Sequence, residues 1–134
     1  MAVQSVTELT VYRKSYVLAM RVFEASKRFP KEEVFALTGQ IRRSSRSVPQ
    51  NLREAWAKRR YPAHFVSKLT DCDGENGETE TSLDFARDCG YIAVKEHAEL
   101  VALCLEVGKM LGSMIQRPEP FLLSCDGRRL PPAS

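Results

Sequence analysis

The residue types that support metal or nucleophilic chemistry are few in this chain and stand far apart. They are four cysteines and two histidines, namely Cys72, Cys89, Cys104, Cys125, His64 and His97. A zinc site needs about four nitrogen or sulfur ligands, usually in two close pairs, and the sequence has no Cys-x-x-Cys. We therefore predict that three cysteines fill small apolar spaces and that Cys125 lies in a tail.

The acidic run from Asp71 to Glu78 is superficially similar to a calcium-binding loop. Counted from Asp71, the sixth position should be glycine and is Asn76, and the twelfth should be glutamate and is Ser82. A helical di-iron site needs Glu-x-x-His, which neither histidine supplies. The sequence also lacks a phosphate loop and a Gly-x-Ser-x-Gly motif. We expect no catalytic residue, no metal and no cofactor, and an enzyme is the weakest class of function.

These residues belong to a chain whose size and composition fit one globular domain. It has 134 residues, of which 43% are hydrophobic and 28% charged, so it can fold without a metal or a disulfide. The N-terminal residues lack the basic-then-apolar pattern of a signal peptide, and Glu106 and Lys109 interrupt the most apolar stretch, 100–115. We expect a protein of the reducing cytoplasm that does not cross a membrane.

Apolar residues at helical spacing predict an all-α fold, with four helices and no strands. The first helix is expected over 8–29, capped by Thr7 and ended by Pro30. Its predicted inward residues are Leu9, Tyr12, Tyr16, Ala19, Met20 and Phe23.

The second helix is expected to open at Pro30 and to contain a proline, Pro49, in its interior. Its predicted inward residues are Phe35, Leu37, Ile41, Ser44, Ser45, Val48, Leu52, Ala55 and Trp56. Serines in that stripe suggest a tight crossing between helices. Pro49 predicts a kink or a short break, with Ser47 and Asn51 placed to satisfy the freed backbone groups.

The third helix is expected over 63–89, with Phe65, Leu69, Cys72, Leu83 and Ala86 inward. Its weakest part is 71–78, where a loop is the alternative. We favour a helix there, with Gly74 allowing another helix to approach closely. Gly90 is expected to end the helix in the left-handed conformation.

The fourth helix is expected over 94–116 and carries two adjoining apolar stripes. One contains Val94, Ala98, Val101, Leu105, Gly108 and Ile115, and the other Leu100, Leu103, Val107, Met110 and Met114. This width suggests burial against a neighbouring subunit, the alternative being an unusually buried helix in a monomer. Residues 1–117 then form the bundle and 118–134 a proline-rich, partly mobile tail, of which 121–123 could dock on the bundle.

Charge is strongly polarised along the chain. Residues 42–60 hold seven basic residues and one acidic, whereas 71–88 hold seven acidic residues and one basic. Three interpretations compete: the charged helices face each other within or between subunits, the basic face binds nucleic acid, or both surfaces are simply solvated. The candidate contact cations are Arg42, Arg43, Arg46, Arg53, Lys58, Arg59 and Arg60. No aromatic residue is interleaved with the arginines between 42 and 53, so base stacking has little support.

Specific motifs resemble a bacterial family, the 23S rRNA-intervening sequence proteins, also known as four-helix-bundle proteins. The resemblance rests on Phe29-Pro30-Lys31-Glu32-Glu33, on Gln40-Ile41-Arg42-Arg43-Ser44-Ser45, on Ser47-Val48-Pro49-Gln50-Asn51-Leu52, and on Gly74, Glu78, Leu83 and Gly90-Tyr91-Ile92. It covers about residues 8–117. The chain departs from the family pattern at Arg53, Asp71 and Glu75, of which the last two suggest a different subunit contact or a frayed third helix.

The resemblance implies an antiparallel up-down four-helix bundle that forms a homo-oligomer. A pentamer is implied by analogy with related accessory proteins of diversity-generating retroelements. Those proteins are non-enzymatic and bind a reverse transcriptase and nucleic acid through basic surfaces. We expect a non-catalytic oligomeric scaffold whose basic second helix contacts RNA, DNA or a nucleic-acid enzyme. The alternative is a purely structural, self-assembling protein with its charges paired between subunits.

Overall fold

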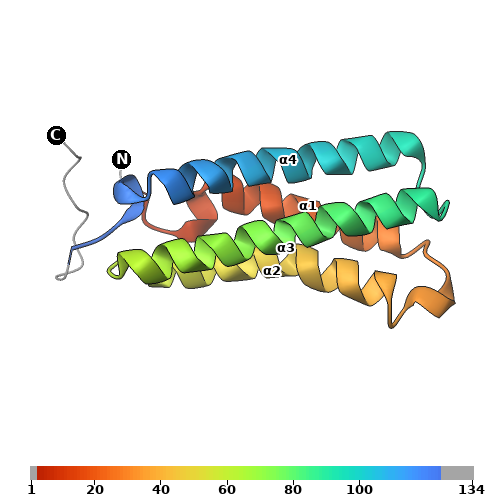
Figure 1. The fold of residues 1–134 in the computed structure, drawn as a ribbon, viewed down its shortest axis with the longest axis horizontal. Helices are drawn as coiled ribbons and strands as arrows, with labels where there is room; N and C mark the ends of the chain where they lie inside the picture. Colours follow the sequence, from red (N-terminus) through yellow and green to blue (C-terminus); the bar gives the residue numbers. More distant parts are fainter. Residues whose placement is uncertain (1–2, 125–134) are drawn as a thin grey trace.

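The protein is an all-α four-helix bundle, seen here in a computed structural model that describes residues 3–124 (Figure 1). The helices are α1 (Thr10–Ser26), α2 (Leu37–Ala57), α3 (Pro62–Asp88) and α4 (Val94–Gln116). Three short 3-10 helices complete the regular elements of the described residues: η1 (Val6–Glu8), η2 (Lys31–Glu33) and η3 (Glu119–Phe121).

Successive helices run in opposite directions, as Figure 1 shows. The contacts between helices show the same arrangement, because residue numbers rise on one helix as they fall on its neighbour. Between α1 and α4, for example, Arg21 pairs with Glu99 and Arg28 with Glu96. The prediction of an all-α four-helix bundle is confirmed, and these contacts are those of an up-down arrangement.

The first helix presents a different face to the core from the one we predicted. The residues of α1 that are buried are Val11, Ser15, Leu18, Ala19, Val22, Ala25 and Ser26. The predicted stripe lies about 100° further round the helix, and of its members Tyr16 and Met20 are 53% and 48% exposed. The prediction failed because Ser15 and Ser26 break the true apolar stripe in the sequence. In the fold each serine hydroxyl donates to a carbonyl of its own helix, at 2.9 Å, so that both can be buried.

The starts of the first two helices also differ from the predictions. Ser5, rather than Thr7, accepts a capping hydrogen bond, and the turn it caps is η1, which precedes α1. After Pro30 the chain forms only the single turn η2, and α2 begins at Leu37. Ala36 has non-helical angles (φ −124°, ψ −105°), which interrupts the predicted helical spacing between Phe35 and Leu37. As a result Phe35 is 98% exposed instead of buried.

Pro49 lies in the middle of α2 without interrupting it. The helix is continuous from Leu37 to Ala57, so a break is excluded, and a kink stays a prediction. Ser47 does not satisfy the carbonyl freed by the proline, because its hydroxyl donates to the Arg43 carbonyl oxygen at 2.8 Å. The helix is held from the side instead, by the buried apolar residues Val48 and Leu52.

The third helix is unbroken through 71–78, which confirms the helical interpretation and contradicts a frayed segment. The close approach predicted at Gly74 is wrong, because a Cβ atom there would meet nothing within 4 Å. The tight contact is made by Gly108 of α4, where a Cβ would lie 3.3 Å from the Asn76 side-chain nitrogen. That nitrogen donates to the Cys104 carbonyl oxygen at 2.8 Å, which joins α3 to α4.

Gly90 ends α3 as predicted, with φ of +79°. The Tyr91 amide donates to the Ala86 carbonyl and the Gly90 amide to the Arg87 carbonyl, at 2.8 and 3.0 Å. This is a Schellman motif, in which a left-handed residue turns the chain back over the helix end.

The fourth helix buries one row of residues: His97, Leu100, Cys104, Val107, Leu111 and Met114. Val94 and Leu105, from the other predicted stripe, are 73% and 61% exposed in the single chain. Beyond α4, Leu122 is buried in the core and the Leu123 amide donates to the Arg59 carbonyl at 3.0 Å, so residues 121–123 do dock on the bundle. The remainder of the predicted tail, from Cys125 on, lies outside the described residues.

Two of the predicted filler cysteines, Cys72 and Cys104, are buried, and burial raises the pKa of both thiols to about 12. Cys89, the third, is exposed at the end of α3. Within residues 3–124, none of the helices combines the length and the apolar character needed to span a bilayer.

Candidate nucleic-acid interface

The seven candidate cations do not form one patch but divide into three groups on the bundle. Arg42, Arg46 and Arg53 recur at four and seven residues, which places them on one face of α2, next to α1. Arg43 lies on the side of α2 that faces α3. Lys58, Arg59 and Arg60 follow the end of α2, in the turn before α3.

The arginine row, as we call Arg42, Arg46 and Arg53, is held over aromatic rings of α1. The guanidinium carbons of Arg42 and Arg46 lie 4.8 and 5.5 Å from the centroid of the Phe23 ring. Arg53 lies 5.7 Å from the centroid of the Tyr12 ring. Such cation–π contacts orient a guanidinium without neutralising its charge.

Polar contacts of the arginine row also go to neutral groups. The Arg42 Nε donates to the Ser26 hydroxyl at 2.7 Å, and an Arg53 terminal nitrogen lies 3.4 Å from the Tyr12 hydroxyl. Within residues 3–124, none of the three arginines forms an ion pair with a carboxylate. Three fixed positive charges therefore stand along α2, spread over about 16 Å at 1.5 Å per residue.

On the side of α2 that faces α3, unlike in the arginine row, basic side chains lie near carboxylates. Burial and then repulsion from Glu78 raise the pKa of Glu75, and the nearby charge of Arg43 opposes this rise. Further along, the Lys68 ammonium of α3 lies 2.8 Å from the Glu54 carboxylate of α2, which lowers the pKa of Glu54 and raises that of Lys68. In this ion pair the acidic partner, Glu54, belongs to the mainly basic helix α2, and the basic partner, Lys68, belongs to the mainly acidic helix α3.

The third group of cations is partly committed to the fold. The Arg59 guanidinium stacks 3.6 Å from the centroid of the Trp56 ring and its Nε donates to the Trp56 carbonyl at 2.8 Å. Burial lowers the pKa of Arg59. Lys58 and Arg60 make no ion pair within the described part of the chain, and neither has an aromatic support like that of Arg59.

A groove separates α1 from α2 beside the arginine row and has a volume of about 580 Å³. Its lining combines aromatic and apolar residues with arginines: Tyr12, Tyr16, Ala19, Met20, Arg46, Pro49, Gln50, Arg53, Glu54 and Ala57. Sequence analysis missed the groove because it looked for aromatic residues only within 42–53. The signal lay in the row of Tyr12, Tyr16, Met20 and Phe23, which was assigned to the core.

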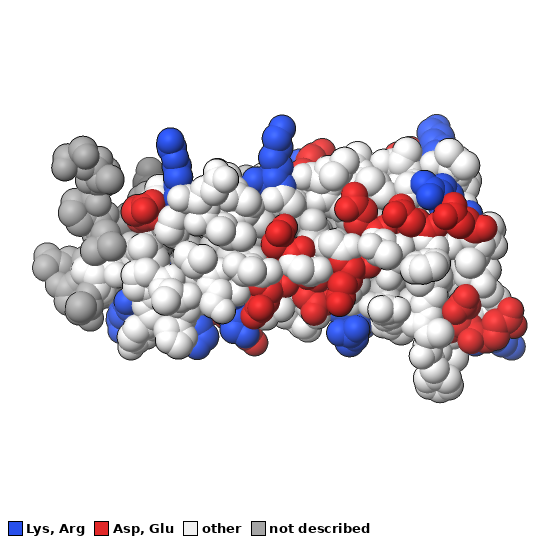
Figure 2. All heavy atoms as spheres, viewed as in Figure 1, with Lys and Arg blue, Asp and Glu red and all other residues white. Residues whose placement is uncertain are grey.

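The acids of α3 lie on another face of the molecule. Figure 2 shows acidic side chains gathered in a band across the middle and right-hand half of this face, over α3 and its junction with α4. In residues 3–124 no arginine of α2 pairs with an acid of α3, so the two oppositely charged segments do not neutralise each other by ion pairs within the chain.

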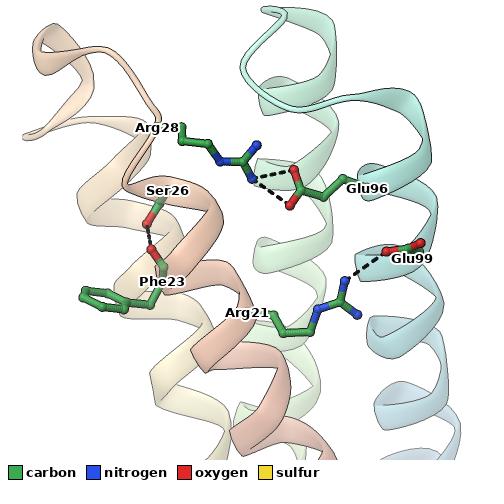
Figure 3. Close-up of polar contacts among 6 residues, drawn as sticks. All are labelled: Arg21, Phe23, Ser26, Arg28, Glu96 and Glu99. Carbon is green, nitrogen blue, oxygen red and sulfur yellow. Dashed lines mark hydrogen bonds and ion pairs between the residues drawn. The ribbon is translucent and has the colours of Figure 1, made fainter.

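Basic residues of α1 pair instead with glutamates of α4. Arg28 and Arg21 lie 2.7 and 3.0 Å from Glu96 and Glu99, and Lys14 pairs with Glu106. Figure 3 shows the two arginines reaching across to α4 while Phe23 points to the opposite side of α1, toward α2. These pairs use the α4 side of α1 and leave its aromatic side beside the arginine row.

Among residues 3–124, no three His, Cys, Asp or Glu side chains come close enough together to hold a metal ion. The arrangement can instead bind an anion along α2 and a flat or apolar group in the groove. Pro49, which lines the groove, is a buried residue of α2, and Asn51 is half-buried on the same helix.

Comparisons with known proteins place this chain in a family. Residues 7–113 match the 23S rRNA-intervening sequence protein family. A crystal structure of a protein of unknown function from the S23 ribosomal protein family of Bacteroides thetaiotaomicron is similar, with 30% identity and a TM-score of 0.73 over 80% of this chain and 99% of that one. No curated protein matches the chain. Since the family match covers well over half of its residues, this protein belongs to the 23S rRNA-intervening sequence protein family.

Proposed function

We propose that this protein is a non-catalytic, self-associating helical scaffold that binds nucleic acid through the arginine row of α2. The observation that carries the proposal is that Arg42, Arg46 and Arg53 share one face without a carboxylate partner among residues 3–124. Positive charges left uncompensated on a rigid helix attract a polyanion, and binding releases its condensed counterions.

Packing on aromatic rings strengthens this argument. An arginine side chain has several rotatable bonds, and fixing them on binding costs entropy. The Phe23 ring already restricts Arg42 and Arg46, and the Tyr12 ring restricts Arg53. The row is thus partly organised before a phosphate arrives, which lowers the entropic cost of binding.

Salt dependence gives the first test. Three phosphate contacts predict a slope of log K against log salt of about −2 for single strands and about −2.7 for duplex. Affinity should therefore fall about 20- to 40-fold between 50 and 200 mM salt. Fluorescence anisotropy with labelled RNA and DNA measures both quantities, and an affinity that is independent of salt would contradict the proposal.

Variants give the second test. Replacing Arg42, Arg46 and Arg53 together by Gln should remove most of the affinity and flatten the salt slope. The matched control replaces three exposed lysines away from the row, Lys31, Lys95 and Lys109, by Gln, with the same change in net charge. Both variants must keep the wild-type helical circular dichroism. Equal affinities of the two variants would refute the role of the arginine row.

Self-association is the second part of the proposal, and it is supported by apolar side chains that the single chain leaves uncovered. Val94, Leu105 and Phe85 are 73%, 61% and 59% exposed on α4 and α3. We expect light scattering to give a mass several times 15.1 kDa, with five subunits as the first expectation from the family resemblance. A monomer at micromolar concentration would contradict this part.

A purely structural assembly is the second candidate function. It is favoured by the acidic band of α3: Asp71, Asp84 and Asp88 contact basic side chains, but Asp73, Glu75, Glu78 and Glu80 form no ion pair within residues 3–124. If this band and the arginine row pair between subunits, high salt will dissociate the assembly and nucleic acid will not be retained. Binding of nucleic acid by the intact assembly decides against this candidate, and a reverse transcriptase or another protein is then tested as a further partner.

A further inference from the structure

The groove between α1 and α2 places aromatic faces and arginines within one surface. The Tyr12 and Tyr16 rings lie side by side, with centroids 6.2 Å apart and planes tilted by 32°. Tyr16 is 53% exposed and Met20, one turn further on, is 48% exposed. The opposite wall is α2, with Arg46, Pro49 and Arg53.

The exposure of this aromatic row is not required by the packing of the bundle. The core face of α1 is complete without it, because Val11, Leu18 and Val22 are 4% exposed or less. Half-exposed aromatic and methionine side chains beside arginines have the composition of a binding surface rather than of a solvated one. A ligand for this groove must therefore match both the apolar floor and the positive rim.

We propose that the groove receives unpaired bases of single-stranded nucleic acid, with a base stacked on Tyr16 and the adjoining phosphates on Arg42, Arg46 and Arg53. This inference rests on the proposed function and names its substrate class. A strand without a partner exposes the faces of its bases, which stack on aromatic side chains with little sequence preference. A duplex buries those faces within its own stack and could use only the arginines.

The dimensions and polar groups of the groove suit this ligand. A volume of about 580 Å³ lies in the range of small-molecule sites and admits a nucleobase. Gln50 and the tyrosine hydroxyl groups line it and can bond to base edges. Glu54 is the acidic residue of the lining, and its pairing with Lys68 at 2.8 Å offsets its repulsion of phosphate.

The experiment compares single strands and duplex on variants of Tyr16. The probes are labelled 20-mers of oligo(U) and oligo(dT) and a 20-base-pair RNA duplex, titrated by anisotropy at 50 mM salt. Tyr16→Leu keeps an apolar side chain but removes the aromatic face. We expect about 5- to 150-fold weaker binding of the single strands and less than 2-fold change for the duplex.

Two further variants control the experiment. Tyr61→Leu removes a tyrosine of similar exposure, 60%, at the α2–α3 turn and should change neither affinity. Tyr16→Trp should restore single-strand binding, since it restores a flat aromatic face. Comparison of oligo(U) with oligo(dT) shows whether RNA or DNA is the better ligand, and tighter binding of either than of duplex supports the inference.

The outcomes distinguish failure of this inference from failure of the proposed function, nucleic-acid binding by the arginine row. If Tyr16→Leu weakens single strand and duplex equally, or neither, while the arginine variant loses binding, the groove is not a base site and the proposed function stands. If the arginine variant binds as the wild type does, the result refutes both the base-stacking inference and the proposed function. A wild-type protein that prefers the duplex also overturns the inference.

Discussion

The hydrogen bond between Ser44 of α2 and Thr79 of α3 permits a quantitative test of how these two helices are joined. Both residues are fully buried, at 0% exposure, and their hydroxyl oxygens are 2.8 Å apart. Each hydroxyl also has a backbone acceptor in its own helix, the Glu75 carbonyl at 3.0 Å for Thr79 and the Ile41 carbonyl at 3.3 Å for Ser44, so either hydroxyl can donate to the other. We propose a double-mutant cycle of Ser44→Ala and Thr79→Val.

The expected magnitude follows from these contacts. A buried hydrogen bond between neutral groups contributes about 0.5–1.5 kcal/mol, and removing both partners together is nearly neutral. Changes in helix propensity enter each single variant but cancel in the cycle. The coupling energy should therefore be about 1 kcal/mol. At about 2.1 cal/mol/K per residue of unfolding entropy, a change of that size shifts Tm by about 3.5 °C.

Urea denaturation followed by circular dichroism measures the four free energies of unfolding. The matched control pairs Ser44→Ala with Thr70→Val, since the Thr70 hydroxyl also donates to a carbonyl of its own helix, that of Val66. Thr70 lies about 13 Å from Thr79 along the helix axis, so the control changes should add within about 0.3–0.5 kcal/mol. Additivity of the Ser44 and Thr79 changes would refute a direct bond across α2 and α3.

Three further predictions concern other parts of the bundle. Gly90→Ala should destabilise the protein by about 1 kcal/mol because φ is +79° there, whereas Gly74→Ala, in an open helical position, should stabilise it by about 0.8–1 kcal/mol in urea denaturation. The hydrogen bond to the Glu33 carboxylate, at 2.8 Å, together with burial raises the pKa of Tyr91 to about 12. Folding therefore favours the neutral Tyr91 phenol. The contribution of Tyr91 to stability is present below about pH 10 and is lost as the pH rises from about 10 to about 12. In Glu33→Gln the absorbance of the Tyr91 phenolate should appear at lower pH than in the wild type. Iodoacetamide at pH 8 should alkylate Cys89 in the native protein well before the two buried thiols of α3 and α4, as peptide mapping would show, and equal rates would contradict their burial.

The number and bounds of α3 and α4 could be predicted from the sequence because both helices end at strong local signals. Pro62 begins α3, Gly90 follows its end, and the chain breaks again after Gln116. The uncertain stretch 71–78 is helical even though Gly74 and Gly77 weaken it locally, because tertiary contacts fix the helix on both sides of them. Packing of the whole element thus outweighs the local cost of two glycines.

The partner of a glycine could not be predicted in the same way. Gly74 and Gly108 both lie in helices, and only the second meets another helix, at the Asn76 side chain. Which glycine faces inward depends on the rotation of each helix about its axis. That rotation is set by all the side chains of the helix together and is not written in the residues next to the glycine.

The same rotation governs the candidate site. Two stripes on α1, about 100° apart, have equally good helical spacing, and composition favoured the aromatic one. The buried serines determine which stripe faces the core. A serine whose hydroxyl bonds to a carbonyl of its own helix occupies little space and lets α1 approach its neighbours closely. The core therefore takes the stripe with Ser15 and Ser26, and Tyr16 is displaced to the surface.

That displacement also determines which arginines can act together. Arg42, Arg46 and Arg53 face α1 and meet the displaced aromatic rings, whereas Arg43, one residue from Arg42, is turned by about 100° toward Glu75 on α3. Net charge along a segment counts all four arginines alike, but a ligand meets only those on one face. The arginine row and the aromatic groove thus both follow from which face of α1 packs into the core. A change that rotated α1, such as replacing Ser15 with a large apolar residue, should therefore impair both together.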